Sequence, residues 1–200
     1  MMDRNLGATS ATPGSVGALG LLYQWGRKDP FLGSSSLSSE QAVSTGTWAI
    51  ESGGSLASAE ANPMTFYLNM YLPSYSWGTK KTAYDPCPVG WRVPDGGGNG
   101  VWATALGSSE DLTVKFDLSK RGLNFSGVFS DAPEVWYPAS GCLRGYDGSL
   151  SYVGTDGYYW SSSPDSSNSS YYLYFGNYGN VAPVNTANFS YGKPVRCLQE

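Results

Sequence analysis

The alternation of apolar and polar side chains is clearest near the end of the chain. Residues 171–175 read Tyr-Tyr-Leu-Tyr-Phe. Successive side chains of a β-strand point to opposite faces, so Tyr171, Leu173 and Phe175 share one face while Tyr172 and Tyr174 share the other. The pattern predicts a strand with one face in the core and one face that displays tyrosines.

Other segments show the same short period and are separated by turn residues. Strands are expected at residues 2–6, 64–77, 112–118, 123–125 with 128–129, 150–153 and 158–162, and in a closing segment where Val195 and Cys197 share a face, whereas residues 21–25 are an apolar run with only loose structure. Asp147-Gly148 and Asp156-Gly157 predict turns, because Asp bonds to nearby backbone and Gly tolerates a positive φ. The chain therefore has many short strands.

Helical signals are few and short. Residues 55–60 suit one or two helical turns, which Asn62-Pro63 ends because the residue before a proline is pushed out of the α region. A second helix is expected at residues 101–106, capped by Asn99. The Gly-rich run 95–100 is interpreted as a flexible insertion, and the Ser/Gly-rich stretch 33–54 as loose structure.

Composition supports a β-rich domain with long ordered loops. Only 14% of the 200 residues are charged, against about 25% in an average domain, and 26 are glycine. We expect an α+β fold of short antiparallel strands with one or two short helices, in a single domain over residues 1–200. Trp91, Trp136 and Trp160 lie in apolar surroundings and are expected in the core.

Charge and hydropathy exclude two classes of partner. The net charge is −4 and there is no basic stripe, which argues against binding to nucleic acid. No stretch approaches the roughly 20 apolar residues of a membrane span, so direct membrane insertion is not expected. The chain is expected to be a monomer in isolation and to derive from a longer exported protein.

The sequence offers little catalytic or metal chemistry. It has no histidine, and its three cysteines, Cys87, Cys142 and Cys197, lack CxxC spacing and permit three alternative single disulfides. Ser190 and Lys193 match an S-x-x-K motif, but Gly192 and Pro194 disfavour the helix that this motif needs. Asp147 and Asp156 could supply oxygen ligands to calcium, although no acidic loop motif completes the set. Neither an enzyme nor a cofactor is predicted.

Residues 158–191 have the composition of a binding surface. They contain 7 Tyr, 8 Ser and 5 Asn, and Asp165 is their only charged residue. Tyrosine gives a large contact area at small entropic cost, and Ser and Asn give adaptable hydrogen bonding, as in antibody paratopes. An ordinary polar loop region is the alternative, but such loops use Lys and Glu freely.

A series of motifs along nearly the whole chain resembles a known family. They are MDRNLGA at residues 2–8, YQWGRK at 23–28, Asn62-Pro63 with Thr65-Phe66, YDPCPVGWRVP at 84–94, YPASG at 137–141, GYYWSS at 157–162, YYLYF at 171–175 and VRC at 195–197. In this order they resemble the major paralogous or fimbrillin-associated domains secreted by gut Gram-negative anaerobes and their phages. Those domains are similar to C-type-lectin-fold proteins, including the variable proteins of diversity-generating retroelements.

The resemblance implies a C-type-lectin-like fold whose first and last strands pair. It also implies a disulfide between Cys87 and Cys197, which leaves Cys142 free and suits an exported, oxidising setting. In the variable proteins, adenine-directed mutagenesis rewrites surface positions near the C-terminus, and mutated asparagine codons readily give Tyr, Ser, Asn, Asp and Gly. The Tyr/Ser/Asn-rich segment would then be the rewritten region.

Several departures from the family limit what the resemblance implies. The family often has an apolar residue followed by Ser where this chain has Lys193-Pro194, and often Arg where it has Phe189. The acidic-Pro-Asn and Trp-Asn-Asp signatures of calcium-dependent lectins are missing. Calcium-mediated sugar recognition is therefore not implied.

The sequence thus predicts a noncatalytic recognition domain on a cell surface or a phage virion, with a protein or glycan on another cell or host surface as its ligand. Trp91, Trp160, Leu173, Phe175 and Val195 are expected in the fixed core. The predicted ligand-binding residues are Tyr158, Asp165, Ser167, Asn168, Ser169, Tyr172, Tyr174, Asn177, Tyr178, Asn180, Asn185, Asn188, Phe189 and Tyr191. The alternative is a structural fimbrial or surface adhesin subunit whose tyrosine-rich face packs against a fixed protein partner.

Overall fold

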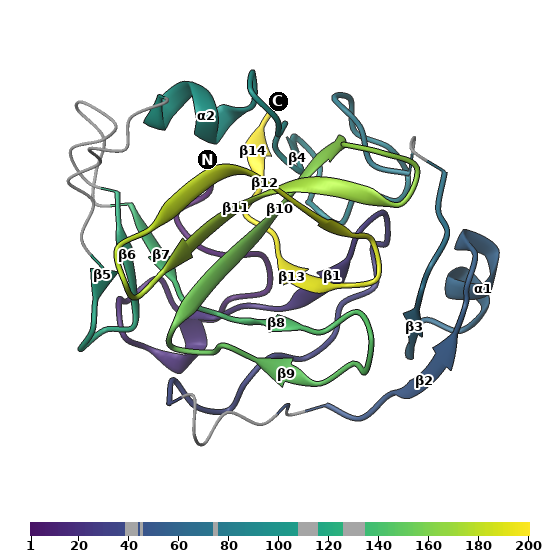
Figure 1. The fold of residues 1–200 in the computed structure, drawn as a ribbon, viewed down its shortest axis with the longest axis horizontal. Helices are drawn as coiled ribbons and strands as arrows, with labels where there is room; N and C mark the ends of the chain where they lie inside the picture. The colour runs from purple at the N-terminus through teal and green to yellow at the C-terminus, as the bar shows by residue number, and fades with distance from the viewer. Residues whose placement is uncertain (39–43, 45, 74–75, 108–115, 126–134) are drawn as a thin grey trace.

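The computed structural model describes residues 1–38, 44, 46–73, 76–107, 116–125 and 135–200 (Figure 1). The helical elements are η1 (Val16–Ala18), α1 (Leu56–Ala61) and α2 (Val101–Leu106). The strands are β1 (Leu22–Gln24), β2 (Ala49–Ser52), β3 (Thr65–Leu68), β4 (Trp91–Arg92), β5 (Phe116–Asp117), β6 (Gly122–Asn124), β7 (Trp136–Pro138), β8 (Cys142–Leu143), β9 (Leu150–Ser151), β10 (Asp156–Pro164), β11 (Ser169–Gly176), β12 (Val181–Asn188), β13 (Gly192–Pro194) and β14 (Leu198–Gln199). The predicted α+β class, with mainly small antiparallel sheets, is confirmed.

The three longest strands form one sheet in the order β10-β11-β12. Its antiparallel register places Tyr158 opposite Tyr174 and Trp160 opposite Tyr172. The opposite face holds Leu173 and Phe175, both fully buried against Trp102 and Tyr137 among others. The prediction that Leu173 and Phe175 face the core is therefore confirmed.

A second sheet lies beneath this one, in the order β1-β13-β8-β9 (Figure 1). β13 is central because it pairs with β1 and β8, and it also contacts β10. Its central place in this sheet, together with its contacts with β10, explains why all three of its residues are buried. Lys193 is the middle residue of β13 and so lies inside the protein.

The two ends of the chain are joined. The amide N–H groups of Met2 and Leu6 donate to the carbonyl oxygens of Cys197 and Val195, at 2.8 and 2.9 Å. Residues 2–6 do not form a regular strand, so the strand predicted there is wrong. The two backbone hydrogen bonds nevertheless hold the ends of the chain together. No helix among the described residues is long and apolar enough to cross a membrane.

A disulfide links Cys87 to Cys197, as the resemblance implied, and Cys142 is free and buried. The bond closes a loop with a sequence separation of 110 residues. In the chain-entropy model a loop of this length corresponds to about 4–5 kcal/mol of stabilisation. A disulfide of this kind is typical of proteins that fold in an oxidising compartment.

The tryptophan predictions are mostly confirmed. Trp160 and Val195 are fully buried and Trp136 is 5% exposed, whereas Trp91 is half-buried at the edge of the main core. That core contains Trp25, Trp77 and Trp160, which are among the largest fully buried side chains. Trp160 is fixed further by its indole N–H, which donates to the Tyr23 carbonyl at 2.9 Å.

The two predicted helices are present. Ser55 caps α1 by accepting from the Ser58 N–H, and the helix ends just before Asn62-Pro63. α2 begins after Gly100, without a side-chain cap, so the expected cap by Asn99 is wrong. The run 95–100 is packed against β10, because the Gly96 N–H donates to Ser163 Oγ at 3.0 Å. The interpretation as a flexible insertion is therefore wrong.

Several strand predictions need correction. Asp156-Gly157 is not a turn but the start of β10, and the turn lies at residues 153–155, where Gly154 has a positive φ. The Asp147-Gly148 turn between β8 and β9 is confirmed. The segment 33–54 contains β2, and the 64–77 strand is only β3. Residues 112–115 and 128–129 lie outside the described residues.

Candidate functional site

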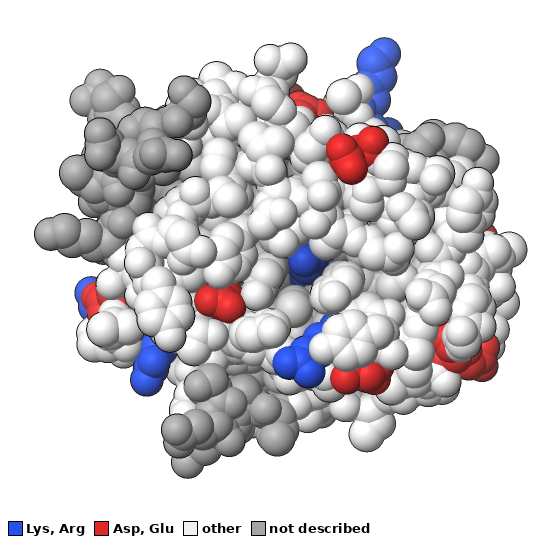
Figure 2. Space-filling view, in the orientation of Figure 1, with Lys and Arg blue, Asp and Glu red and all other residues white. Residues whose placement is uncertain are grey.

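The strongest candidate site is a pocket of about 390 Å³ between the two sheets, here called the Lys193 pocket. Figure 2 shows a hollow in the middle of this face, with a basic group at its floor and neutral side chains around it. The segments around it are β8, the turn before β10, and β10 to β13. Its lining residues are Cys142, Tyr152, Tyr158, Tyr172, Thr186, Ala187, Asn188, Tyr191 and Lys193.

Aromatic rings surround the Lys193 ammonium. Its Nζ lies 3.8 Å from the ring centroid of Tyr172 and 4.8 Å from that of Tyr158. The rings of Trp160 and Tyr191 follow at 4.8 and 4.9 Å. A cation over an aromatic face is attracted by the ring quadrupole, and the attraction grows when the site is dry. These four rings, the aromatic cage, come from β10, β11 and the turn before β13.

Among the described residues, the partners of the Lys193 ammonium are the rings of the cage. The residue is 2% exposed, and within the described part of the chain no carboxylate forms an ion pair with it. Burial removes water from the ammonium and lowers the pKa of Lys193 to about 8. A buried charge without an ionic or hydrogen-bonding partner is rare, because proteins normally pair such charges.

Tyr158, Tyr172, Tyr191 and Cys142, which line the pocket, stay neutral near pH 8. Burial raises the pKa values of Tyr158, Tyr172 and Tyr191, and it raises the pKa of the Cys142 thiol. The Tyr158 hydroxyl donates to Asp156 Oδ2 at 3.1 Å, and burial raises the pKa of that carboxyl group. Lys193 is therefore the group whose charge dominates the floor of the pocket.

Two polar groups at the mouth of the pocket have hydrogen-bond donors that no protein group accepts from among the described residues. Asn188 Oδ1 accepts from the Ser190 N–H at 3.0 Å and from Ser190 Oγ at 2.8 Å, which fixes the orientation of the amide. Among the described residues, neither the Asn188 NH₂ group nor the Thr186 hydroxyl donates to another group of the protein. Both groups are available to a ligand.

A second aromatic cluster with a cation borders the pocket. The guanidinium carbon of Arg144 lies 5.5 Å from the ring centroid of Tyr152, a lining residue, and 5.7 Å from that of Tyr146. The two tyrosines are 47% and 60% exposed. The edge of the pocket therefore presents exposed aromatic surface and a second positive charge.

The structure brings together only part of the predicted site. Tyr158, Tyr172, Asn188 and Tyr191 line the pocket, and Tyr174 contacts Tyr158 with ring centroids 5.4 Å apart. Asn185 lies opposite Tyr172 in β12. The remaining predicted residues, apart from Phe189, fall into two groups at opposite ends of β11: Asp165, Ser167 and Asn168 in the β10–β11 connection with Ser169 at the start of β11, and Asn177, Tyr178 and Asn180 in the β11–β12 turn.

Two predicted display residues belong to the interior. Phe189 is fully buried and stacks on Trp25, with ring centroids 4.2 Å apart, so a displayed Phe189 is wrong. Tyr172 is 8% exposed, because its ring covers Lys193 and meets Trp160 edge-on. The face of the sheet that was expected to be free packs on β13. The alternation of side chains along one strand cannot predict such a contact, because it depends on another strand.

Sequence reasoning missed Lys193, Tyr152, Tyr146 and Arg144. The sequence pairs Lys193 with Ser190 in an S-x-x-K motif and marks it as a departure from the family, but Ser190 Oγ accepts from the Met70 backbone N–H at 2.8 Å. The residue type itself was the available signal. Lys193 stands where the family often has an apolar residue and comes two residues after Tyr191, so a lysine at this position needs a reason to be there.

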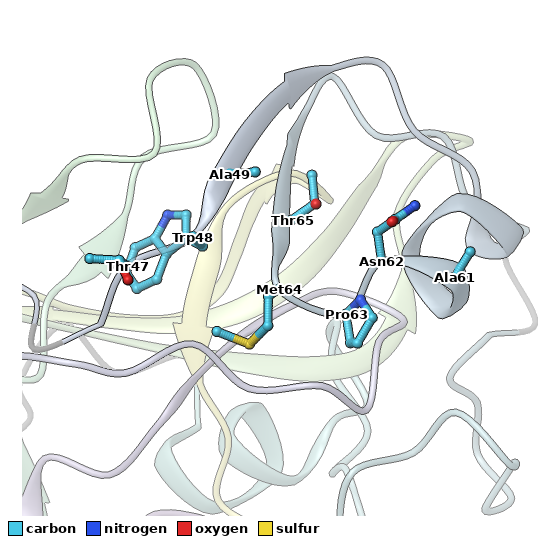
Figure 3. Close-up of a pocket in the computed structure, with 8 residues that line it drawn as sticks. All are labelled: Thr47, Trp48, Ala49, Ala61, Asn62, Pro63, Met64 and Thr65. Carbon is cyan, nitrogen blue, oxygen red and sulfur yellow. The ribbon is translucent and has the colours of Figure 1, made fainter.

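A larger hollow of about 540 Å³ lies between α1 and the start of the β2–β3 pair (Figure 3). Its lining residues are Thr47, Trp48, Ala49, Ala61, Asn62, Pro63, Met64 and Thr65, and none of them is charged. It contains no buried ionisable group and none of the predicted site residues. Its size alone does not make it the better candidate.

The described residues do not assemble the metal site or the S-x-x-K helix considered from the sequence. They contain no group of three or more His, Cys, Asp or Glu side chains that could hold a metal ion. Asp147 accepts hydrogen bonds from Ser149, at 2.9 and 2.7 Å, which is ordinary turn chemistry. Ser190 and Lys193 do not lie on a helix, since β13 is extended.

Comparisons of the chain with protein-family models, with curated proteins and with solved structures found no match. A function for the chain is therefore inferred from the geometry of the Lys193 pocket and from the motifs of the sequence.

Proposed function

We propose that this protein is a noncatalytic ligand-recognition domain of C-type-lectin-like fold, displayed outside the cell or on a phage virion, and that the Lys193 pocket is the centre of its binding surface. The observation that carries the proposal is the buried ammonium of Lys193, which is surrounded by four aromatic rings and has no ionic partner among the described residues. The ligand is a protein or a glycan on another cell or host surface.

A binding role explains features that stability alone does not. A buried lysine without an ionic partner costs folding free energy, and an apolar side chain would fill the same space more favourably. Binding sites keep such groups because their ligands complete them. The site also combines rigid aromatic walls with polar groups at its mouth, the usual composition of a small-molecule or hot-spot pocket.

Residues beyond the pocket lining extend this surface. Tyr174 and Asn185 are half-buried on β11 and β12, and Asp165, Ser167 and Asn168 are exposed in the β10–β11 connection. In the proposed function they adapt the surface to a particular ligand, as the resemblance to retroelement variable proteins implies. The buried walls of the pocket stay constant while these positions change.

Thr186→Trp tests the proposal by filling the mouth of the pocket. Thr186 is exposed and lines the pocket from β12, so a large side chain there blocks entry without entering the core. Val184→Trp is the matched control, because Val184 lies two residues away in the same strand, is 42% exposed and does not line the pocket.

The measurement is the binding of the fluorescently labelled domain to a panel of gut bacterial and host epithelial cells. We expect the wild-type domain and Val184→Trp to stain the same cells and Thr186→Trp to lose at least about tenfold in apparent affinity, which is the size of a lost hot spot. Equal staining by all three proteins would contradict a role of the pocket in recognition.

A further inference from the structure

The geometry points to a specific ligand chemistry for the Lys193 pocket: it receives an acidic sugar, with the carboxylate on the Lys193 ammonium and the sugar ring against the tyrosine walls. This inference rests on the proposed function and goes further, because it names the class of ligand. Three properties of the pocket carry it: the charge at its floor, its aromatic walls and the polar groups at its mouth.

The floor of the pocket favours an anion. Lys193 has positive charge below pH 8 and contacts rings only, so its ammonium has unused donors for a hydrogen bond with an acceptor. A carboxylate is an acceptor-only group and forms strong charge-assisted bonds with an ammonium. Arg144 beside Tyr152 adds a second positive charge at the edge. Asp156 is already engaged by the Tyr158 hydroxyl and is not a lining residue.

The walls and the mouth favour a hydroxylated ring over an acidic peptide side chain. Tyr158 meets the rings of Tyr172 and Tyr174 at interplanar angles of 40° and 49°, so the tyrosines form inclined surfaces rather than a flat stack. Such faces suit the C–H surface of a sugar ring. Thr186 and Asn188 then offer a hydroxyl and an amide NH₂ to sugar hydroxyls. The acidic side chain of a peptide would leave these polar groups unused.

The volume also fits a single sugar. Pockets for small ligands usually measure about 300–1,000 Å³, and this one, at about 390 Å³, lies at the lower end. It therefore accommodates one ring at the floor, while neighbouring sugars of a glycan extend towards Tyr146 and Tyr152 at the edge. No metal is needed to hold the acid, because the lysine supplies the charge.

Binding of the acid should weaken as the pH rises through about 8, because Lys193 then loses its proton. The titratable groups that face it from β8, β10, β11 and the turn before β13 are Cys142, Tyr158, Tyr172 and Tyr191. Burial raises the pKa of each of these groups, so all remain neutral through this range. Arg144 stays charged, since its pKa is raised by the neighbouring tyrosines despite some desolvation.

Three soluble probes test the inference by NMR titration of the purified domain. Methyl glucuronide carries the acid on a sugar ring, methyl glucoside is its neutral counterpart, and N-acetylglutamate N-methylamide carries an acid on a peptide. We expect the glucuronide to bind at least about tenfold more tightly than either other probe at pH 6.5, since a hydrogen bond to a charged group supplies this difference. Lys193→Met should remove the preference, and Thr186→Trp should remove binding.

Each other outcome overturns the inference in a recognisable way. Equal binding of glucuronide and glucoside excludes the carboxylate contact, and tighter binding of the glutamate probe excludes the sugar ring. If Lys193→Met still binds methyl glucuronide more tightly than the other two probes, the carboxylate does not bind to Lys193. If none of the probes binds while Thr186→Trp still abolishes cell staining, the ligand class is wrong and the proposed function stands. If Thr186→Trp leaves cell staining unchanged, the proposed function itself fails.

Discussion

The buried charge of Lys193 lowers the free energy of unfolding, and the size of this effect depends on pH. Its pKa is about 8 in the folded protein, against 10.5 for an ordinary lysine, so between these values the unfolded chain holds more protons than the folded one. The contribution of Lys193 to the free energy of unfolding therefore rises as the pH rises from about 8 towards 10.5. The attraction of the aromatic rings reduces the cost of burial but does not restore the ordinary pKa.

Replacing Lys193 with Met tests whether the residue serves binding or structure. Because Met fills similar space without a charge, we expect Lys193→Met to be more stable than the wild type at pH 7 by about 1–3 kcal/mol. The difference should be constant below pH 8 and narrow between pH 8 and 10.5. Urea denaturation followed by tryptophan fluorescence measures both effects.

Ionisation of the tyrosines does not confuse this comparison. Burial raises the pKa values of Tyr23 and Tyr159 as well as those of the cage, so the stability that these groups contribute is lost as the pH rises above 10. This loss affects both proteins and cancels in their difference. A less stable Lys193→Met protein at pH 7 would show that the contacts of the ammonium outweigh its desolvation, and Lys193 would then be a structural residue.

Among the elements, the Gly-rich segment before α2 has an unexpected role. The Ser162 N–H donates to the carbonyl of Pro94 at 2.8 Å, where the register of β10 with β11 is interrupted between Trp160 and Pro164. Gly96 lies against the same part of β10, and a Cβ there would come within 2.1 Å of Ser161 Oγ and 2.8 Å of Tyr171 Cβ. The segment supports the sheet that carries the pocket.

Gly96→Ala should therefore destabilise the protein, whereas Gly98→Ala should not. A Cβ at Gly98 meets nothing within 4 Å, so this variant is a control in the same segment. We expect Gly96→Ala to lower the free energy of unfolding by about 1–3 kcal/mol, as for an overpacked site, and Gly98→Ala to change it by less than about 0.5 kcal/mol. Equal effects in thermal unfolding would contradict the support that this segment gives to β10.

The elements also show what the sequence can predict here and what it cannot. Period two identified β11, and Ser55 with Asn62-Pro63 marked α1, because these signals are local. β12 was missed, since Pro183 and the polar residues of this strand do not resemble a buried strand. The packing of the sheet face on β13 was also missed, because it depends on segments far apart in the sequence.

At the scale of the whole molecule, the pocket is assembled from segments that span residues 142–193. The disulfide at Cys197 and the backbone bonds of residues 2 and 6 hold the segment after β13 in place. A rigid floor and walls therefore carry exposed loops. This arrangement permits changes at the surface without repacking of the core, which is what a diversified binder requires.

Sequencing the 3′ end of the gene in many cells of its source population tests whether exposed positions vary while buried positions stay constant. We expect replacements at exposed positions such as Asp165, Ser167, Asn168, Tyr178 and Asn180. Trp160, Leu173, Phe175 and Phe189 should stay constant, because each is fully buried and its replacement by a small side chain costs about 2–5 kcal/mol. Phe189 is the sharpest case, since the resemblance alone would count it among the variable positions. An invariant segment over residues 158–191 would instead favour a dedicated adhesin or fimbrial subunit, whose exposed tyrosines are fixed because they fit one protein partner.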